Sequence, residues 1–400
     1  MKHRQSHGPS RRARGWAVAG GVTGGIALGA ALAIGIPRYV ARRTRASSSD
    51  PYAHEPFELP PTSSVFTLRT EDGAPIHVET VGPDDADLTV VFAHGYMQDM
   101  NTFYFQRKAV AEATGLSMRA VLYDQPGHGR SGPLARTEYT IEDLAGILHE
   151  VLESAAPSGP LVLVGHSMGG MTIQVYARLH PEVFAERVKG VAFLSTSAAG
   201  LDTVETKPMR ALRRLRRTVL PMLQQVAGWT PDLIDRSRML AGDLGWLLTR
   251  RSSFVTANPP ASIVSLVERM NRGTSIQSIV GYARAILDHD ETATLPLFKG
   301  LPTLVAVGDS DPLTPPEHSR RLAEALPGSR LELIGEAGHS PQLEYPGEIS
   351  QHLLEMIDKV AAEIGDGSTA APCPPVREDA GRGRRRWTPF SRPYGPRLES

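Results

Sequence analysis

The stretch Gly165-His166-Ser167-Met168-Gly169-Gly170 decides which fold this chain is expected to adopt. It follows an apolar run at residues 161–164 and precedes a segment, residues 171–179, that suits a helix. A serine therefore stands where a buried strand turns sharply into a helix, and this turn strains its backbone and lifts its hydroxyl above the sheet. The residues two before and two after it must lack a bulky side chain, as Gly165 and Gly169 do. An ordinary strand-to-helix turn is the alternative interpretation.

A serine hydroxyl is a weak nucleophile near neutral pH and needs two partners. A histidine must take its proton, and an acid must fix the tautomer of that histidine. The strand predicted at residues 301–307 leads to Asp311, and the next predicted strand, residues 331–334, leads to His339 in a glycine loop. We therefore predict His339 as the base and Asp311 as the acid, with Asp309 as the alternative acid.

Two other histidines lie near the predicted site in sequence. His128 belongs to the turn-rich loop 125–132, where it is expected to pack and to form hydrogen bonds within the loop. His166 precedes Ser167, but its side chain points the opposite way and is expected to pack beneath the turn. Neither histidine is predicted to take part in the chemistry.

Strand and helix patterns alternate along the middle of the chain. Residues 64–69 and 75–81 alternate apolar and polar side chains and predict a hairpin. More continuously apolar runs at 88–93, 119–124 and 190–195 predict buried strands. Thr140 is a predicted helix N-cap. This order predicts an α/β fold with a mostly parallel sheet that is covered on both faces.

A segment of about 100 residues, 198–296, interrupts this alternation with helical periodicity and predicts a helical lid. Its apolar side chains line an acyl pocket or form the core of the lid: Trp229, Trp246, Leu247, Leu248 and Phe254. One helical face carries Arg210, Arg213, Arg214 and Arg217. That face either contacts anionic lipid or is simply solvated.

Residues from about 64 to 360 resemble the serine-dependent α/β-hydrolase superfamily with a lid. The style of the motifs is similar to monoacylglycerol lipase-like esterases, cofactor-free haloperoxidases and C–C bond hydrolases. The matching motifs are His94-Gly95, the loop 124–132, the stretch 165–170, Gly308-x-x-Asp311 and Gly338-His339. Serine at the sharp turn argues against epoxide hydrolases and haloalkane dehalogenases, which carry aspartate there.

This resemblance implies an α/β-hydrolase fold in which the nucleophile, acid and base follow the chain order Ser167, Asp311, His339. It also implies an oxyanion hole formed by the backbone amides of Tyr96 and Met168. The expected activity is hydrolysis of a small carboxylic ester or a lipid through an acyl-enzyme, with no metal or cofactor. Acyltransferase, thioesterase, C–C hydrolase and haloperoxidase activities would use the same three residues, and a non-catalytic ligand-binding protein is a further alternative.

Composition sets broader limits. The chain has 400 residues and 41% apolar content, enough for a large core. Lysine plus arginine and aspartate plus glutamate both number 43, so the net charge gives no indication of a nucleic-acid partner. The single cysteine, Cys373, excludes an intramolecular disulfide and a cysteine zinc site.

An uncharged segment, residues 15–36, precedes the globular part. About 22 residues at ~1.5 Å each suffice to cross a membrane. We expect a single-pass anchor with the catalytic domain outside, and a cleaved secretory signal ending near Ala31-Leu32-Ala33 is the alternative. Gly21, Gly25 and Gly29 form a stripe along which a second copy would approach closely, or they belong to a glycine-rich span without a partner.

These observations give one expected domain scheme. It comprises a basic N-terminus (1–14), a transmembrane or signal segment (15–37), a linker (38–61), an α/β-hydrolase core (62–197 and 297–364), a helical lid (198–296) and a disordered tail rich in proline and arginine (365–400).

Overall fold

The computed structural model describes residues 37–46, 49–57, 64–135, 139–206, 210 and 242–365. The predicted membrane segment with its Gly21, Gly25 and Gly29 stripe lies outside these residues. So do Trp229, three of the four lid arginines and the predicted disordered tail from residue 366. Among the helices that are described, none combines the length and the apolar character needed to cross a membrane.

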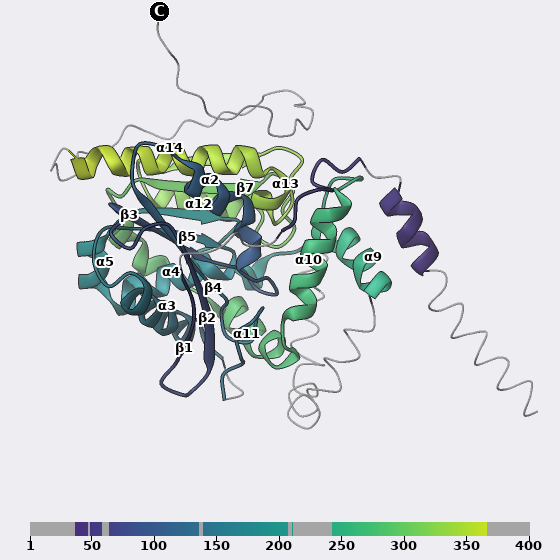
Figure 1. Ribbon diagram of the computed structural model, residues 1–400, viewed down its shortest axis with the longest axis horizontal. Helices are drawn as coiled ribbons and strands as arrows, with labels where there is room; N and C mark the ends of the chain where they lie inside the picture. Colours follow the sequence, from purple (N-terminus) through teal and green to yellow (C-terminus); the bar gives the residue numbers. More distant parts are fainter. Residues whose placement is uncertain are drawn as a thin grey trace, which may run out of the picture.

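An eight-stranded sheet forms the centre of the molecule (Figure 1), in the order β1-β2-β4-β3-β5-β6-β7-β8. The strands are β1 (Ser64–Arg69), β2 (Pro75–Val81), β3 (Leu88–Ala93), β4 (Met118–Tyr123), β5 (Leu161–His166), β6 (Val188–Leu194), β7 (Thr303–Gly308) and β8 (Arg330–Ile334). β2 pairs antiparallel with β1 and with β4, whereas all pairings from β4 to β8 are parallel. The predicted α/β fold with a mostly parallel sheet is therefore confirmed.

Helices cover both faces of this sheet because its central strands are apolar on both sides. Every residue of β3, β5 and β7 is buried. One face packs against α3 (Ile141–Ala155), α4 (Met168–Leu179), α5 (Pro181–Arg187) and α12 (Pro316–Ala325). The other packs against α2 (Tyr104–Glu112) and α14 (Pro346–Gly365).

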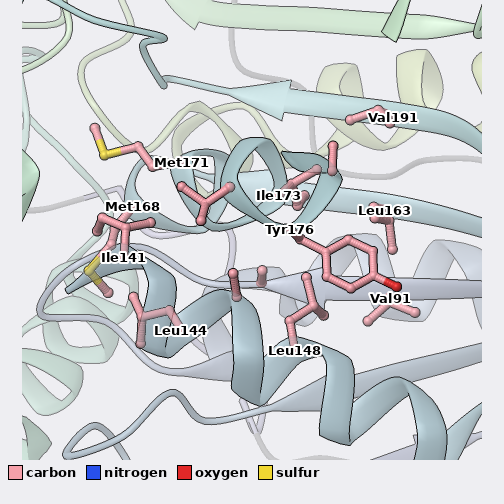
Figure 2. Packing of buried hydrophobic residues seen from close by; sticks show 14 of the residues in the cluster. Val91, Ile141, Leu144, Leu148, Leu163, Met168, Met171, Ile173, Tyr176 and Val191 are labelled. Carbon is pink, nitrogen blue, oxygen red and sulfur yellow. The ribbon is translucent and has the colours of Figure 1, made fainter. Parts of the chain in front are cut away.

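Figure 2 shows the core on the first face, where α3 and α4 meet each other and the sheet. Leu144 and Leu148 of α3 lie beside Met168 and Tyr176 of α4. Each such side chain contributes about 1.5–3 kcal/mol on burial. Packing of this kind fixes the start of α4, and with it the end of β5.

The predicted N-cap of α3 is present. Thr140 Oγ1 accepts from the Asp143 N–H at 3.1 Å, and the Asp143 carboxylate accepts from the Thr140 N–H at 2.9 Å. The pair satisfies two N–H groups that the first helical turn leaves without intrahelical acceptors.

The strand order places an opening at the carboxyl edge of the sheet. The chain passes from β3 to β4 on one side and then to β5 on the other side of β3. Loops that follow β3 and β5 therefore leave in opposite directions, and such a reversal is where ligands bind in open α/β sheets.

The described part of the insertion between β6 and β7 is helical. It contains η2 (Leu201–Thr203), α9 (Gly242–Ser253), α10 (Ala261–Gly273), α11 (Ile276–Asp288) and η3 (Thr292–Phe298). The Ser275 N–H donates to the Gly127 carbonyl at 2.8 Å, and Tyr96 donates its hydroxyl to the Ile279 carbonyl. The insertion is thus attached to the loops that follow β3 and β4, and its role as a lid stays a prediction.

The structure differs from the linker that we expected at residues 38–61. Residues 37–46 form a helix, and Arg45 of that helix pairs with Asp243 of α9 at 2.8 Å. The Arg45 guanidinium also lies 4.6 Å from the centre of the Trp246 ring. We call residues 37–46 and 49–57 the N-terminal arm.

The rest of the N-terminal arm packs against α2 and α10. Tyr52 and Phe57 are buried, with ring centres 5.0 and 6.0 Å from that of Phe105. The Asp50 carboxylate accepts from the Ser262 N–H at 2.7 Å, in the first turn of α10. Serine and proline content suggested a linker, but two aromatic side chains supply enough apolar surface to fold the segment onto the domain.

Candidate active site

Ser167 occupies the predicted sharp turn between β5 and α4. Its φ of 52° and ψ of −117° lie in a region that residues other than glycine rarely adopt. A Cβ at Gly169 would lie 1.9 Å from the Ala93 carbonyl oxygen, and one at Gly165 would lie 2.6 Å from the Gly170 nitrogen. Only glycine fits at these two positions, so the sequence requirement behind the turn has a steric cause.

His339 reaches Ser167 from the loop that follows β8. Its Nε2 lies 3.0 Å from Ser167 Oγ. Its Nδ1 lies 2.8 Å from one carboxylate oxygen of Asp311 and 3.1 Å from the other. Because a carboxylate only accepts, Nδ1 carries the proton and Nε2 is left to accept from the serine hydroxyl.

Asp311 is held by several donors in a fully buried position. Its carboxylate accepts from the Leu313 N–H at 2.8 Å, the Thr314 N–H at 3.0 Å and the Thr314 hydroxyl at 2.7 Å. Burial raises the pKa of Asp311, but His339 and these donors outweigh burial and leave the pKa below its usual value. Asp309, the alternative acid, is exposed to solvent.

The first glycine loop contacts the other side of Ser167. A Cβ at Gly95 would lie 3.1 Å from Ser167 Cβ and 2.6 Å from His166 Nδ1. Tyr96 follows in this loop, and Met168 begins α4, where the first N–H groups of a helix have no intrahelical acceptor. The two residues predicted to supply amide donors thus lie in the two segments that flank Ser167.

His128 packs in its loop, as expected, and also contacts the first glycine loop. Nδ1 donates to the Pro126 carbonyl at 3.0 Å, and Nε2 accepts from the Met97 N–H at 3.2 Å. Burial lowers the pKa of His128 to about 4, so the ring is neutral and able to accept. Met97, the donor of this contact, has a φ of 59° in the left-handed region.

His166 has a contact that sequence reasoning missed. The ring is buried, as expected, but its Nε2 donates to the backbone carbonyl of His339 at 2.7 Å. Burial lowers the pKa of His166 to about 3, and the nearby His339 lowers it further. No sequence signal reveals this contact, because it joins residues that are 173 positions apart.

The lid residues predicted to line a pocket divide into two groups. Trp246 and Phe254 are buried in a cluster with Ile263 and Val267 of α10, so they belong to the core of the insertion. Leu248 is exposed, and Leu247 packs partly against that cluster. Within the described ranges, no three His, Cys, Asp or Glu side chains gather to hold a metal ion.

Comparisons with known proteins agree with this architecture. Residues 89–346 match the family model described as "alpha/beta hydrolase fold". The chain is 26% identical over 350 residues to the sn-1-specific diacylglycerol lipase ABHD11 of Mus musculus, with 82% of this chain and 93% of the relative covered. It is 27% identical over 288 residues to the pimeloyl-[acyl-carrier protein] methyl ester esterase of Chromobacterium violaceum. That match covers 72% of this chain and 99% of the esterase.

Solved structures show the same fold. The esterase EaEST of Exiguobacterium antarcticum superimposes with a TM-score of 0.56 at 21% identity, covering 74% of this chain and all of the esterase. The family model spans more than half of the chain and includes both Ser167 and His339. By its sequence, strand order and sharp strand-to-helix turn, the chain belongs to the alpha/beta hydrolase fold family.

Proposed function

We propose that this alpha/beta hydrolase cleaves carboxylic esters through an acyl-enzyme. The observation that carries the proposal is the hydrogen-bonded series from Ser167 through His339 to Asp311 at 3.0 and 2.8 Å. Similarity to a diacylglycerol lipase and a methyl ester esterase supports an ester as the substrate class.

In the first step, His339 Nε2 takes the proton of Ser167 as Oγ attacks the ester carbonyl. Asp311 stabilises the imidazolium that forms, because His339 and the donors around the carboxylate keep its pKa low and the group ionised. The backbone amides of Tyr96 and Met168 are proposed to hold the oxyanion of the tetrahedral intermediate.

His339 then gives its proton to the leaving alcohol, and the acyl group remains on Ser167. Water enters, loses a proton to Nε2 and attacks the acyl carbon. Collapse of the second tetrahedral intermediate returns the proton to Oγ and releases the carboxylic acid. Every proton therefore passes through one nitrogen, which explains why the ring needs a fixed tautomer.

The test is hydrolysis of p-nitrophenyl esters of graded acyl length by the wild type and by Ser167→Ala. We expect kcat to fall by about 10⁴-fold or more, since loss of the nucleophile leaves only binding and oxyanion stabilisation. Wild-type turnover by Ser167→Ala would contradict the proposal. The chain length that gives the highest kcat/KM separates a short-chain esterase from a lipase.

A further inference from the structure

We propose that Glu344 is a positioning residue that holds the loop carrying His339 at hydrogen-bonding distance from Ser167. The inference rests on the proposed function for its kinetic consequences and goes beyond it by assigning a role to a side chain outside the Ser167, His339 and Asp311 series.

The contacts of Glu344 are specific to the backbone on both sides of His339. Glu344 ends the short helix α13 (Pro341–Glu344), and its side chain folds back toward the preceding loop. Oε1 accepts from the Gly338 N–H at 2.9 Å and from the Ser340 N–H at 3.3 Å. One oxygen atom thus binds the amides that immediately precede and follow the predicted base.

The same loop is fixed at other points by side chains from distant elements. His166 donates to the His339 carbonyl at 2.7 Å, and Gln98 Nε2 donates to the Ser340 hydroxyl at 3.1 Å. These contacts restrain a carbonyl and a hydroxyl, whereas Glu344 supplies the acceptor for the loop amides. Without it, two N–H groups in a buried loop would lose their acceptor, at a cost of about 1–3 kcal/mol each.

Close packing around Gly338 limits the conformations open to the loop that carries His339. A Cβ at Gly338 would lie 3.2 Å from Val255 of the insertion and 3.3 Å from Glu344 Oε1. Glu344 is itself 2% exposed, so its oxygen is shielded from bulk solvent. A small shift of the loop would change the distance from Nε2 to Oγ, and a misplacement of about 1 Å at a reacting group lowers rates by about 100-fold.

The surroundings of the second oxygen of Glu344 bear on the protonation of its carboxyl group. Oε2 is buried and has no hydrogen-bond partner in the described part of the chain. Burial, with a smaller contribution from Asp311, raises the pKa of Glu344 to about 8. The raised pKa favours the neutral acid, and Oε1 is the acceptor for the two amides in either form. A glutamine provides the same acceptor oxygen and a similar shape.

Substitutions of Glu344 fall into two kinds, those that keep the acceptor oxygen and those that remove it. Glu344→Gln keeps the acceptor, and we expect kcat for ester hydrolysis within about threefold of wild type. Glu344→Leu and Glu344→Ala remove it, and we expect kcat to fall by about 10- to 100-fold with KM little changed, because the substrate pocket is not altered. Equal kcat for Glu344→Leu and wild type would overturn the proposal, as would a large loss of kcat in Glu344→Gln.

Glu291 provides the matched control. It is also buried, and its carboxylate accepts from the Arg178 guanidinium at 2.9 Å and from the Thr294 hydroxyl, away from His339. Glu291→Leu should lower the melting temperature without the selective fall in kcat. A fall in kcat in Glu291→Leu as large as that in Glu344→Leu would mean that general destabilisation, and not positioning, explains the effect.

A spectroscopic measurement does not depend on the proposed reaction. The Nδ1 proton that His339 donates to Asp311 should give a strongly deshielded ¹H NMR signal, assigned by its absence in His339→Asn. We expect the signal to persist in Glu344→Gln and to disappear in Glu344→Leu. If wild type hydrolyses no ester but the signal responds in this way, the proposed function fails and the positioning role stands. An unchanged signal in folded Glu344→Leu overturns the positioning role alone.

If Glu344→Leu and Glu344→Ala do not fold, hydrogen exchange in the wild type tests whether Glu344 protects the amides on either side of His339. The amides of Gly338 and Ser340 should exchange slowly, measured by mass spectrometry on peptides covering residues 335–345. Exchange at the rate of an unprotected loop would overturn the proposal.

Discussion

Asp311 and Asp309 differ by two positions in sequence and completely in environment. The strand β7 ends at Gly308, and the turn that follows directs Asp309 to solvent and Asp311 inward to four hydrogen-bonding groups. Residue type and spacing allow both acids, so the sequence favours one without excluding the other. The two acids are distinguished by the structure, in which Asp311 lies 2.8 Å from His339 Nδ1 and Asp309 is exposed to solvent.

Substitution of the two acids tests this difference. Asp311→Asn should lower kcat by about 10⁴-fold, because an amide no longer fixes the histidine tautomer or stabilises the imidazolium. Asp309→Asn, with its side chain in solvent, should leave kcat within about twofold. Both are measured on one p-nitrophenyl ester at constant pH. The reverse order of effects would transfer the acid role to Asp309.

His289 gives a prediction about stability and pH. Burial lowers its pKa to about 4, while the unfolded chain has the usual value near 6.5. The folded state therefore binds fewer protons than the unfolded state between these values. Its stabilising contribution is complete above pH 6.5 and is lost as the pH falls toward 4.

Urea unfolding of His289→Gln should show this contribution. Between pH 7 and pH 4.5 we expect the wild type to lose about 2–3 kcal/mol more than the variant. His54→Gln, which changes an exposed histidine, should follow the wild type. Parallel curves for wild type and His289→Gln would show that His289 does not titrate in this way.

At the scale of elements, the strands were the most predictable part. The expected bounds of residues 64–69, 75–81 and 88–93 coincide with β1, β2 and β3. These segments are short, strongly patterned and bounded by turn residues, so local sequence determines them. The N-terminal arm was not predictable, because its helix and two aromatic side chains are stabilised by α2, α9 and α10, which follow much later in the chain.

Asp50 tests whether the N-terminal arm stabilises the insertion. α10 has no N-cap side chain of its own, since Pro260 occupies that position, and Asp50 accepts from its Ser262 N–H. Asp50→Ala should therefore destabilise the protein by about 1 kcal/mol, measured as a lower melting temperature. Asp85→Ala, at an exposed loop position, is the control. An unchanged melting temperature in Asp50→Ala would show that the arm and α10 are not coupled.

At the scale of the whole molecule, pattern and chain order together predicted the fold family and brought Ser167, Asp311 and His339 into one site. Contacts that depend on long-range packing escaped prediction. The side chain of Glu344 reaches the Gly338 and Ser340 amides, and the ring of His166 reaches the His339 carbonyl, only after β5, β8 and α13 have assembled. A large part of the predicted lid, residues 207–209 and 211–241, lies outside the described residues.

The apolar segment 15–36 stays a sequence-based prediction. If it anchors the protein, full-length chain expressed in cells should remain in the membrane pellet after alkaline carbonate extraction, because a spanning helix resists removal of peripheral proteins. A variant lacking residues 1–36 should appear in the supernatant. Release of the full-length chain by carbonate would contradict the anchor, and a shortened N-terminus found by mass spectrometry would indicate a cleaved signal.

The central claim is that His339 activates Ser167 as a nucleophile. Treatment of the folded protein with a fluorophosphonate, followed by peptide mass spectrometry, tests it most directly. We predict one phosphonyl adduct, on Ser167, that is reduced at least about 100-fold in rate in His339→Ala. An unlabelled wild type, or an adduct on another residue with Ser167 unmodified, would contradict the account.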